Sequence, residues 1–396
     1  MLRSLFAGIS GLRSHQTMMD VTGNNIANVN TAGFKSSTTV FQDTLSQLLR
    51  GAGAPVGDNG GTNPAQVGLG VRVAAVTTNF AQGSAQSTGR STDLMIQGDG
   101  FFVVRNGGEN LYTRAGAFSF DTDGRLTSPE GAVVQGWSAV NGVVDTNAPV
   151  GDIKLPVGAV LAPVATTVAT LGGNLPSDAA LGTIVRTSIK VFDAAGTPTD
   201  LDVTATMGAG GTWTLASSVG ALVPATLSFT GSGATPSATA IAFTATVGGQ
   251  VISLDTSKLT GFAGQNTLAA TSQNGSAMGT LQAFTMSPDG TLVGVFSNGL
   301  KSPLAQVSLA NFNNPPGLEK VGGSMYRTTV NSGTEQLGVA GTAGRGLLSS
   351  GQLEMSNVDL AAEFTNLIVA QRGFQANSRV ITTSDQILED LVNLKR

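Results

Sequence analysis

The chain lacks the residues on which most catalytic and metal sites depend. Its 396 residues include no cysteine and a single histidine, His15. The absence of cysteine excludes disulfides, thiolate metal sites and cysteine nucleophiles, and one histidine cannot supply a multi-histidine metal site within one chain. No nucleophile–base pair is visible either. We therefore predict that the chain is not an enzyme and has no catalytic, cofactor-binding or metal-binding residues.

Charged residues are also scarce. They make up 12% of the chain, about half of the roughly 25% usual in soluble domains. The formal net charge of -4 gives no reason to expect nucleic acid or an anionic membrane as a partner. A lightly charged surface repels copies of itself only weakly, which suits self-association. Composition alone fits an ordinary secreted β-protein equally well.

Long hydrophobic runs are missing as well. No stretch approaches the ~20 apolar residues that span a membrane, so we expect no membrane insertion. The first ten residues place their apolar side chains at intervals and show no convincing small-residue cleavage site, unlike a secretory signal. We expect that, if the protein leaves the cell, it does so without a cleaved signal peptide.

The C-terminal segment carries the clearest periodic pattern. From Leu360 a seam follows in alternating steps of four and three, as in a heptad repeat. This pattern predicts a helix of roughly 35 residues, ~50 Å long. Ser356 to Asp359 is expected to form a capping box, and Glu354 is expected to be a solvated carboxylate of the helix. The apolar seam positions are Leu360, Phe364, Leu367, Phe374, Ile381 and Leu388.

A matching seam lies at the N-terminus. Gly8, Gly11 and Gly23 should weaken this helix by ~1 kcal/mol each relative to alanine. Each terminal helix has one apolar stripe, so we expect the two ends of the chain to pair and then to pack against other chains. The alternative is an intrachain helical hairpin that closes an ordinary monomer. The N-terminal seam positions are Leu2, Leu5, Ile9, Leu12 and Met19.

The middle of the chain, from about residue 70 to 350, has the composition of β structure. It is rich in Thr, Val and Gly, and Asp-Gly pairs at Asp123–Gly124 and Asp289–Gly290 indicate hairpin turns. Residues 155–280 almost lack arginine and are richer in Ala, Thr, Gly and Ser, which indicates a separate domain inserted in a host domain.

The predicted fold class is mainly β with α-helical termini, in a nested multidomain arrangement. The N- and C-terminal helices pair as a coiled coil, and the outer of two all-β domains is inserted into the inner one. The predicted ranges are 1–35 and 352–396 for the terminal helical domain, 36–80 for a linker or extended region, 81–154 and 281–351 for the inner β domain, and 155–280 for the outer inserted β domain.

Two long motifs stand at opposite ends of the chain, one at residues 23–35 (GNNIANVNTAGFK) and one at residues 353–360 (LEMSNVDL) followed by 371–377 (QRGFQAN). The first resembles the N-terminal signature of the flagellar rod and hook protein family, and the second resembles the other half of that signature. Two long motifs in the right order make the resemblance specific. The motif residues are Asn24, Asn25, Ala27, Asn28, Thr31, Gly33, Phe34, Ser356, Asn357, Val358, Asp359, Gln371 and Arg372.

Several inner segments are similar to the hook members of this family. They span residues 98–104, 112–118, 135–137, 296–300 and 309–322, whereas residues 155–280 match only loosely. The distal rod protein of the same family remains an alternative, although it is shorter and lacks an inserted outer domain. A secreted β-rich adhesin or carbohydrate-active enzyme is a second alternative, but it would need a signal peptide or a catalytic constellation.

The resemblance implies a structural subunit of the flagellar hook. Many copies would form a curved helical tube, with the paired terminal helices at its inner wall, that acts as a universal joint between rod and filament. The implied partners are further copies of this chain, the distal rod protein, the hook cap protein, the hook–filament junction protein, the hook-length control protein and the flagellar type III export apparatus. The implied location is extracellular, in the hook attached to the basal body.

Overall fold

The computed structural model describes residues 2–55, 60–156, 158, 160–218, 226–230, 235–236, 245–247 and 250–393. Contacts divide the chain into two compact units. The first unit contains Met1–Leu155, Thr285–Val293 and Pro303–Arg396, and the second contains Pro156–Phe284 and Gly294–Ser302. Each unit is described by itself below.

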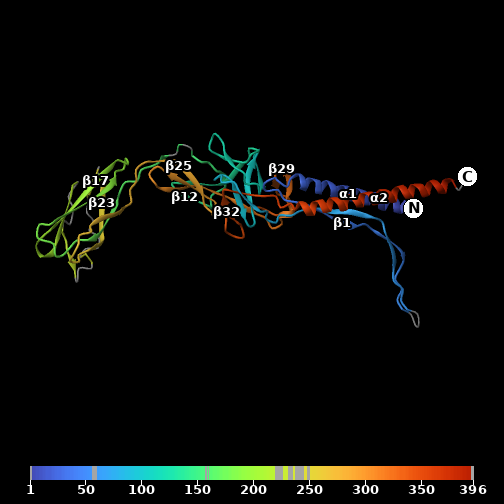
Figure 1. The fold of residues 1–396 in the computed structure, drawn as a ribbon, viewed down its shortest axis with the longest axis horizontal. Helices are drawn as coiled ribbons and strands as arrows, with labels where there is room; N and C mark the ends of the chain where they lie inside the picture. The colour runs from blue at the N-terminus through green and yellow to red at the C-terminus, as the bar shows by residue number, and fades with distance from the viewer. Residues whose placement is uncertain are drawn as a thin grey trace. The chain divides into compact units, whose positions relative to one another are not determined.

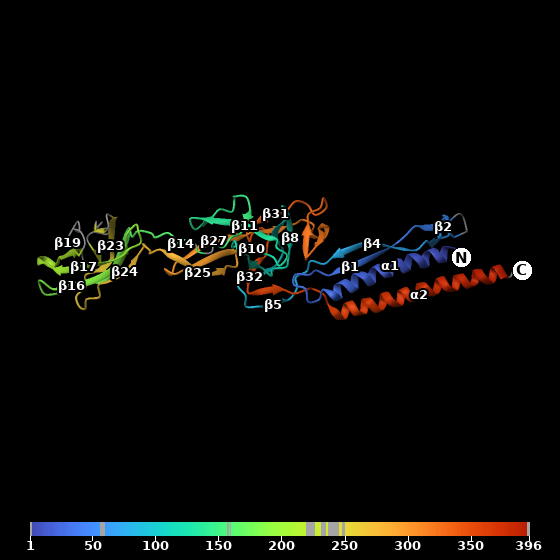
Figure 2. The same cartoon turned by 90° about the horizontal axis from the view of Figure 1, so that it is seen from above.

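Two long helices of the first unit pack side by side, as Figures 1 and 2 show. Helix α1 spans Leu2–Ala27 and helix α2 spans Leu360–Asn393. They run antiparallel, because the hydroxyls of Ser4 and Ser384 lie 3.5 Å apart near one end, whereas Asn25 contacts Glu363 near the other. Among the described residues, no helix is long and apolar enough to cross a membrane.

A two-stranded ribbon of β1 and β4 lies along α1, on the side away from α2 (Figure 2). Strands β2 and β3 form a separate two-stranded sheet. The other strands of this unit form a β body, in which the central order runs β11-β7-β8-β30-β29. The strands are β1 (Ser37–Asp43), β2 (Ser46–Arg50), β3 (Ala65–Gly68), β4 (Val71–Thr78), β5 (Ala85–Ser87), β6 (Leu94–Gln97), β7 (Phe101–Asn106), β8 (Glu109–Thr113), β9 (Ser119–Phe120), β10 (Leu126–Thr127), β11 (Val133–Val140), β12 (Val143–Val144), β13 (Gly151–Asp152), β28 (Leu309–Asn311), β29 (Glu319–Gly322), β30 (Met325–Arg327), β31 (Gln336–Gly338), β32 (Leu347–Ser350) and β33 (Gln352–Glu354).

An aromatic cluster forms part of the core of this β body. Phe101 on β7, Tyr112 on β8 and Tyr326 on β30 are buried together with Phe312. The rings of Tyr112 and Phe312 meet edge to face with centroids 4.8 Å apart, a geometry that aromatic quadrupoles favour. Strands far apart in the sequence are therefore joined in one core.

The second unit consists mainly of two four-stranded sheets, ordered β22-β23-β15-β24 and β16-β17-β18-β19. Their facing sides share one apolar core that includes Leu171, Val203 and the fully buried Trp213. The strands are β14 (Val160–Leu161), β15 (Val168–Asn174), β16 (Ile184–Phe192), β17 (Pro198–Met207), β18 (Trp213–Ser217), β19 (Thr226–Leu227), β20 (Phe229–Thr230), β21 (Thr235–Pro236), β22 (Ala245–Val247), β23 (Gln250–Thr260) and β24 (Ala269–Gln273).

Three further strands have residues in both units: β25 (Gly279–Met286), β26 (Thr291–Phe296) and β27 (Lys301–Val307). Short 3-10 helices occupy Ala209–Gly211 and Pro315–Gly317. The two predicted Asp-Gly turns are confirmed, since Gly124 and Gly290 both have the positive φ that such turns require. The predicted fold class, mainly β with paired helical termini, is confirmed as well.

The predicted capping box is wrong in its position. The Asp359 carboxylate, not the Ser356 hydroxyl, accepts hydrogen bonds from the first helical N–H groups, at 2.9 Å from Ala361 and 3.3 Å from Ala362. Asp359 is therefore the N-cap of α2, and its charge is favourable at the positive end of the helix dipole. Ser356 lies three residues too early to reach these donors.

Candidate functional site

Glycines bring the two terminal helices close together. A Cβ built on Gly373 of α2 would lie 2.5 Å from the His15 ring of α1, and one on Gly11 would lie 2.7 Å from the Asn377 side chain. Gly8 faces Ile381 in the same way, at 3.2 Å. The glycines that reduce the helix propensity of α1 thus create its contact surface. Gly23 is different, because a Cβ there would meet nothing within 4 Å.

The predicted seam residues divide between two faces of the helix pair. One group is half-buried: Leu5, Leu12 and Met19 on α1, and Leu367, Phe374, Ile381 and Leu388 on α2. A second group is exposed: Ile9, Leu360 and Phe364. The side chain of Leu2 lies outside the described residues. The sequence pattern therefore merged an inner face, which packs within the chain, with an outer face that the chain leaves uncovered.

The outer face of α2 is more apolar than the seam pattern indicated. Sequence reasoning missed Ile368, Val369, Val380 and Ile387, all of which are exposed. The signal was present as isolated large apolar residues between the heptad positions. We call the exposed apolar residues of this helix the α2 outer face, and its members are Leu360, Phe364, Ile368, Val369, Val380 and Ile387. With 3.6 residues per turn, the first three follow one edge of the exposed side of the helix and the last three follow the other edge.

One asparagine from each motif fixes the segment that leaves α1. The Asn25 amide accepts from the Ser37 N–H at 3.0 Å and donates to the Ser37 carbonyl at 2.8 Å. The Asn357 carbonyl oxygen accepts from the Ser36 N–H at 2.8 Å. Asn25 also donates to Glu363 at the start of α2, at 2.9 Å. An amide is needed at both positions because it donates and accepts at once.

A buried cluster of three charged residues, the ion cluster, lies at the base of the helices. Lys35 Nζ donates to Glu354 Oε1 at 2.6 Å, and both side chains are fully buried. Arg114 Nη1 lies 3.6 Å from Glu354 Oε2, and its guanidinium is 5.3 Å from the centre of the Phe101 ring. The cluster joins the segment after α1, the β body and β33, which precedes α2. It therefore connects both helical ends to the β body.

Burial sets the electrostatics of the ion cluster. Desolvation lowers the pKa of Lys35, although the hydrogen bond to Glu354 acts in the opposite direction. Desolvation likewise lowers the pKa of Arg114. Further hydrogen bonds support the buried charges, because Lys35 also donates to the Ala81 carbonyl at 2.8 Å and the Gly83 N–H donates to Glu354 at 2.8 Å.

The sequence-based interpretation of Glu354 as a solvated helical carboxylate is wrong. Glu354 ends strand β33 and is 1% exposed. Sequence reasoning also missed the roles of Lys35, Arg114 and Glu363. In a chain with so few charges, a lysine directly after Gly33-Phe34 and a glutamate inside the C-terminal motif were the available signals.

The turn after α1 carries the rest of the N-terminal motif. Asn28 donates to the Asn24 carbonyl at 2.9 Å, and the Thr31 hydroxyl donates to Asn28 Oδ1 at 3.1 Å. Gly33 has φ 68°, and a Cβ there would lie 2.4 Å from the backbone nitrogen of Ala115. Only glycine can therefore bring this turn against the β body.

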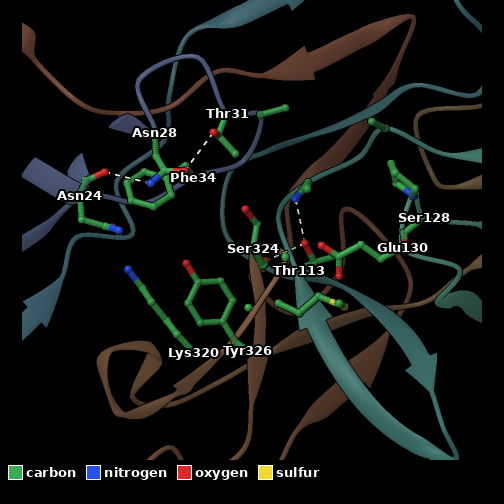
Figure 3. A pocket seen from close by; sticks show the side chains of 17 residues that line it. Asn24, Asn28, Thr31, Phe34, Thr113, Ser128, Glu130, Lys320, Ser324 and Tyr326 are labelled. Atoms are coloured by element: carbon green, nitrogen blue, oxygen red, sulfur yellow. Dashed lines mark hydrogen bonds between the residues drawn. The ribbon is translucent and has the colours of Figure 1, made fainter. Parts of the chain in front are cut away.

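A cavity of about 430 Å³ opens beside this turn. Figure 3 shows Asn24, Asn28 and Phe34 on one side and Lys320 and Tyr326 on another. The Lys320 ammonium lies 5.1 Å from the centre of the Phe34 ring, and burial lowers the pKa of Lys320. Among the described residues that line the cavity, no nucleophile and base are in hydrogen-bond contact.

The remaining motif residues lie at the surface. Ala27, Asn24, Gln371 and Arg372 are exposed, whereas Ser356 and Val358 are half-buried. Within the described part of the chain, the guanidinium of Arg372 donates a hydrogen bond only to Gln375 on its own helix, at 3.5 Å. The structure thus brings part of the two motifs together at the helix base and leaves the other part facing outward.

Known proteins match the chain over its full length. Three family descriptions match: "Flagella basal body rod protein" at residues 5–35, "Flagellar hook protein FlgE/F/G D1 domain" at residues 95–172, and "Flagellar basal body rod FlgEFG protein C-terminal" at residues 349–394. The flagellar hook protein FlgE of Borreliella burgdorferi is 39% identical over 441 residues, which covers 100% of each chain.

The chain belongs to the flagellar hook protein family. The family match makes it a structural subunit of the flagellar hook that assembles with copies of itself. A crystal structure of the Helicobacter pylori flagellar hook protein FlgE2 has the same fold, with a TM-score of 0.54 at 15% identity. The structural match covers 68% of this chain and 100% of the Helicobacter pylori chain.

A rod-named relative is also similar to this hook-family chain. The flagellar basal-body rod protein FlgG of Bacillus subtilis is 33% identical and covers 100% of both chains. The rod alternative is nevertheless less supported, because the hook-named relative has the higher identity to this chain.

Proposed function

We propose that copies of this chain assemble head-to-tail into a curved helical tube that transmits motor torque from rod to filament. The observation that carries the proposal is the α2 outer face, which no other element of the described chain covers. Exposed apolar surface of this extent indicates contact with another protein. A heterologous contact that does not close into a ring generates an open helical assembly.

The energetic gain from such contacts is large compared with the stability of a helix pair. Complete burial of a side chain such as Phe364 or Ile368 contributes ~1.5–3 kcal/mol. In the tube, the paired terminal helices form the inner wall, and the seam residues of both helices pack there. Few charges on the surface keep the repulsion between neighbouring copies low.

In this role the chain has no catalytic task and binds neither nucleic acid nor membrane. It is exported unfolded by the flagellar type III apparatus without a cleaved signal peptide and acts outside the cell. Its further contacts are the distal rod protein at one end of the hook, the cap and hook–filament junction proteins at the other, and the hook-length control protein during assembly. Family membership supports each of these contacts.

Assembly of purified full-length protein tests the proposal. We expect hollow tubes of wild-type protein by negative-stain electron microscopy, and at least a tenfold loss of tubes for Phe364→Glu, since Phe364 is 50% exposed and belongs to the α2 outer face. Val330→Glu is the matched control, because Val330 is fully exposed in a loop of the β body. Tubes formed equally well by Phe364→Glu would contradict the proposed role of this face.

A further inference from the structure

The cavity beside the turn after α1 contains a pair of polar side chains with unused hydrogen-bonding capacity. Lys320 on β29 and Tyr326 on β30 are direct partners in an antiparallel strand pair, so their side chains leave the same face as neighbours. Both line the cavity, whose volume is about 430 Å³. Figure 3 shows the Lys320 ammonium and the Tyr326 hydroxyl pointing toward Phe34.

The Tyr326 hydroxyl is a polar group without a partner on a buried side chain. Tyr326 is 2% exposed, yet within the described part of the chain its hydroxyl makes no hydrogen bond. Burial raises the pKa of Tyr326, so the hydroxyl keeps its proton at neutral pH and remains a donor. Buried donors are usually satisfied, and a ligand in the cavity would satisfy this one.

The Lys320 ammonium also has a donor to spare. It donates to the Ser37 hydroxyl at 2.9 Å and to the Lys35 carbonyl at 3.3 Å, which leaves one of its three N–H groups free. Among the described residues, no carboxylate lies within ion-pair distance of it. Figure 3 shows Glu130 well apart from Lys320, beside Ser128. The ammonium therefore attracts an anion into the cavity.

Asn24 of the N-terminal motif supplies a third donor. It is exposed and lines the cavity, and its side-chain amide has no hydrogen-bond partner in the residues that the structure describes. Figure 3 shows this amide pointing toward Lys320. Phe34, Ala115 and Met325 supply apolar wall around the donors. An apolar cavity with a few convergent polar groups is the usual form of a small-molecule site.

We propose that this cavity binds a monocarboxylate with an apolar body. The carboxylate accepts hydrogen bonds from Lys320, Tyr326 and Asn24, and the apolar body packs against Phe34. One ammonium and two neutral donors balance a single negative charge, whereas a phosphate group, with nearly two charges, would lack sufficient counter-charge. The binding does not depend on tube assembly, because all the lining residues belong to the first unit of one copy.

Isothermal titration calorimetry of the full-length subunit tests this site with 3-phenylpropionate as the probe. Acetate lacks the apolar body and 3-phenylpropionamide lacks the charge, so each is expected to bind about tenfold more weakly or worse. Tyr326→Phe removes only the hydroxyl and should weaken binding of the probe by about tenfold, as expected for one hydrogen bond to a charged group. Tyr112→Phe is the matched control, because Tyr112 is also buried but does not line the cavity.

Three results would overturn the proposal: no detectable binding of 3-phenylpropionate, equal binding of the amide, or equal binding by the Tyr326→Phe variant. If Tyr326→Phe fails to fold, Asn24→Ala is measured instead, since Asn24 is exposed. This variant should bind the probe about fivefold more weakly, and unchanged binding would overturn the assignment of the carboxylate.

The same titration on assembled tubes distinguishes two sources of the carboxylate. Binding that persists in tubes indicates a free carboxylic acid as the ligand. Binding to subunits that is lost in tubes indicates that a carboxylate side chain of a neighbouring copy occupies the cavity. Failure of the wild-type chain to form tubes would contradict the proposed function alone, because the titration of the subunit still tests the cavity.

Discussion

Single residues at the helix base explain why the two terminal motifs contain the residue types they do. Asn25 and Asn357 hold the backbone of Ser36 and Ser37 from two sides. Lys35 and Glu354 form a buried ion pair whose partners are more than three hundred residues apart in the sequence. These residues of the two terminal motifs therefore make the contacts that join both ends of the chain to the β body.

Replacing Glu354 by glutamine should destabilise the first unit by about 3–5 kcal/mol, because the substitution leaves the Lys35 charge buried without a counter-charge. Calorimetric unfolding of the full-length protein measures the change. Glu109→Gln is the control, since Glu109 pairs with Arg327 at the surface and should matter far less. A loss of stability below about 1 kcal/mol for Glu354→Gln would show that the ion cluster does not stabilise the fold.

Asp193 makes the free energy of unfolding of the second unit depend on pH in the acidic range. The hydrogen bond from the Thr197 N–H, at 2.8 Å, lowers the pKa of Asp193. Because the folded pKa lies below the ordinary value of about 3.9, the stabilisation is fully present above about pH 4 and is lost as the pH falls through the folded pKa.

The Asp193→Asn variant should therefore be less stable than wild type at pH 7, with a difference that shrinks toward pH 2. Urea unfolding at both pH values measures it. Asp200→Asn is the control, because Asp200 pairs with Lys190 at the surface with an N···O distance of 3.5 Å. A difference for Asp193→Asn that does not change with pH would contradict this assignment.

At the scale of single elements, the periodic patterns were the most informative part of the sequence. The heptad seam predicted a helix that begins at Leu360, as α2 does. The seam did not reveal which side of the helix faces α1, because residues of both faces are apolar. It also did not reveal how closely the two helices pack. That close approach depends on glycines, which helix propensity alone counts as unfavourable.

Gly373→Val should weaken the pairing of α1 and α2, because the added side chain meets the His15 ring. Gly23→Ala is the matched control and should instead stabilise α1 by up to about 1 kcal/mol, since nothing lies near the added methyl. The temperature at which tubes dissociate, followed by light scattering, reports both effects. Equal dissociation temperatures for Gly373→Val and wild type would show that the close approach is not needed.

Strand pairing could not be predicted from the sequence in detail. Strand β28 (Leu309–Asn311) pairs with β7 (Phe101–Asn106), about two hundred residues earlier in the chain. Turn residues such as Asp123–Gly124 predict a hairpin because their contacts are local, whereas pairing between distant strands depends on a core that forms only in three dimensions. The same limit applies to Arg114 and Glu354, whose contact depends on that core.

At the scale of the whole molecule, scarcity of charge and the α2 outer face support the same conclusion. The first keeps the repulsion between copies low, and the second gives them apolar surface to bury. The division into a terminal helical domain, a linker and two β domains stays a prediction, as does the assignment of the seam to contacts between copies.

Immunogold electron microscopy tests the central claim most directly. An antibody raised against residues 160–275 is applied to whole cells and to isolated flagellar bases. We expect gold on the short curved segment between the cell envelope and the filament. Gold confined to the straight rod, or spread over the cell wall, would contradict a hook subunit.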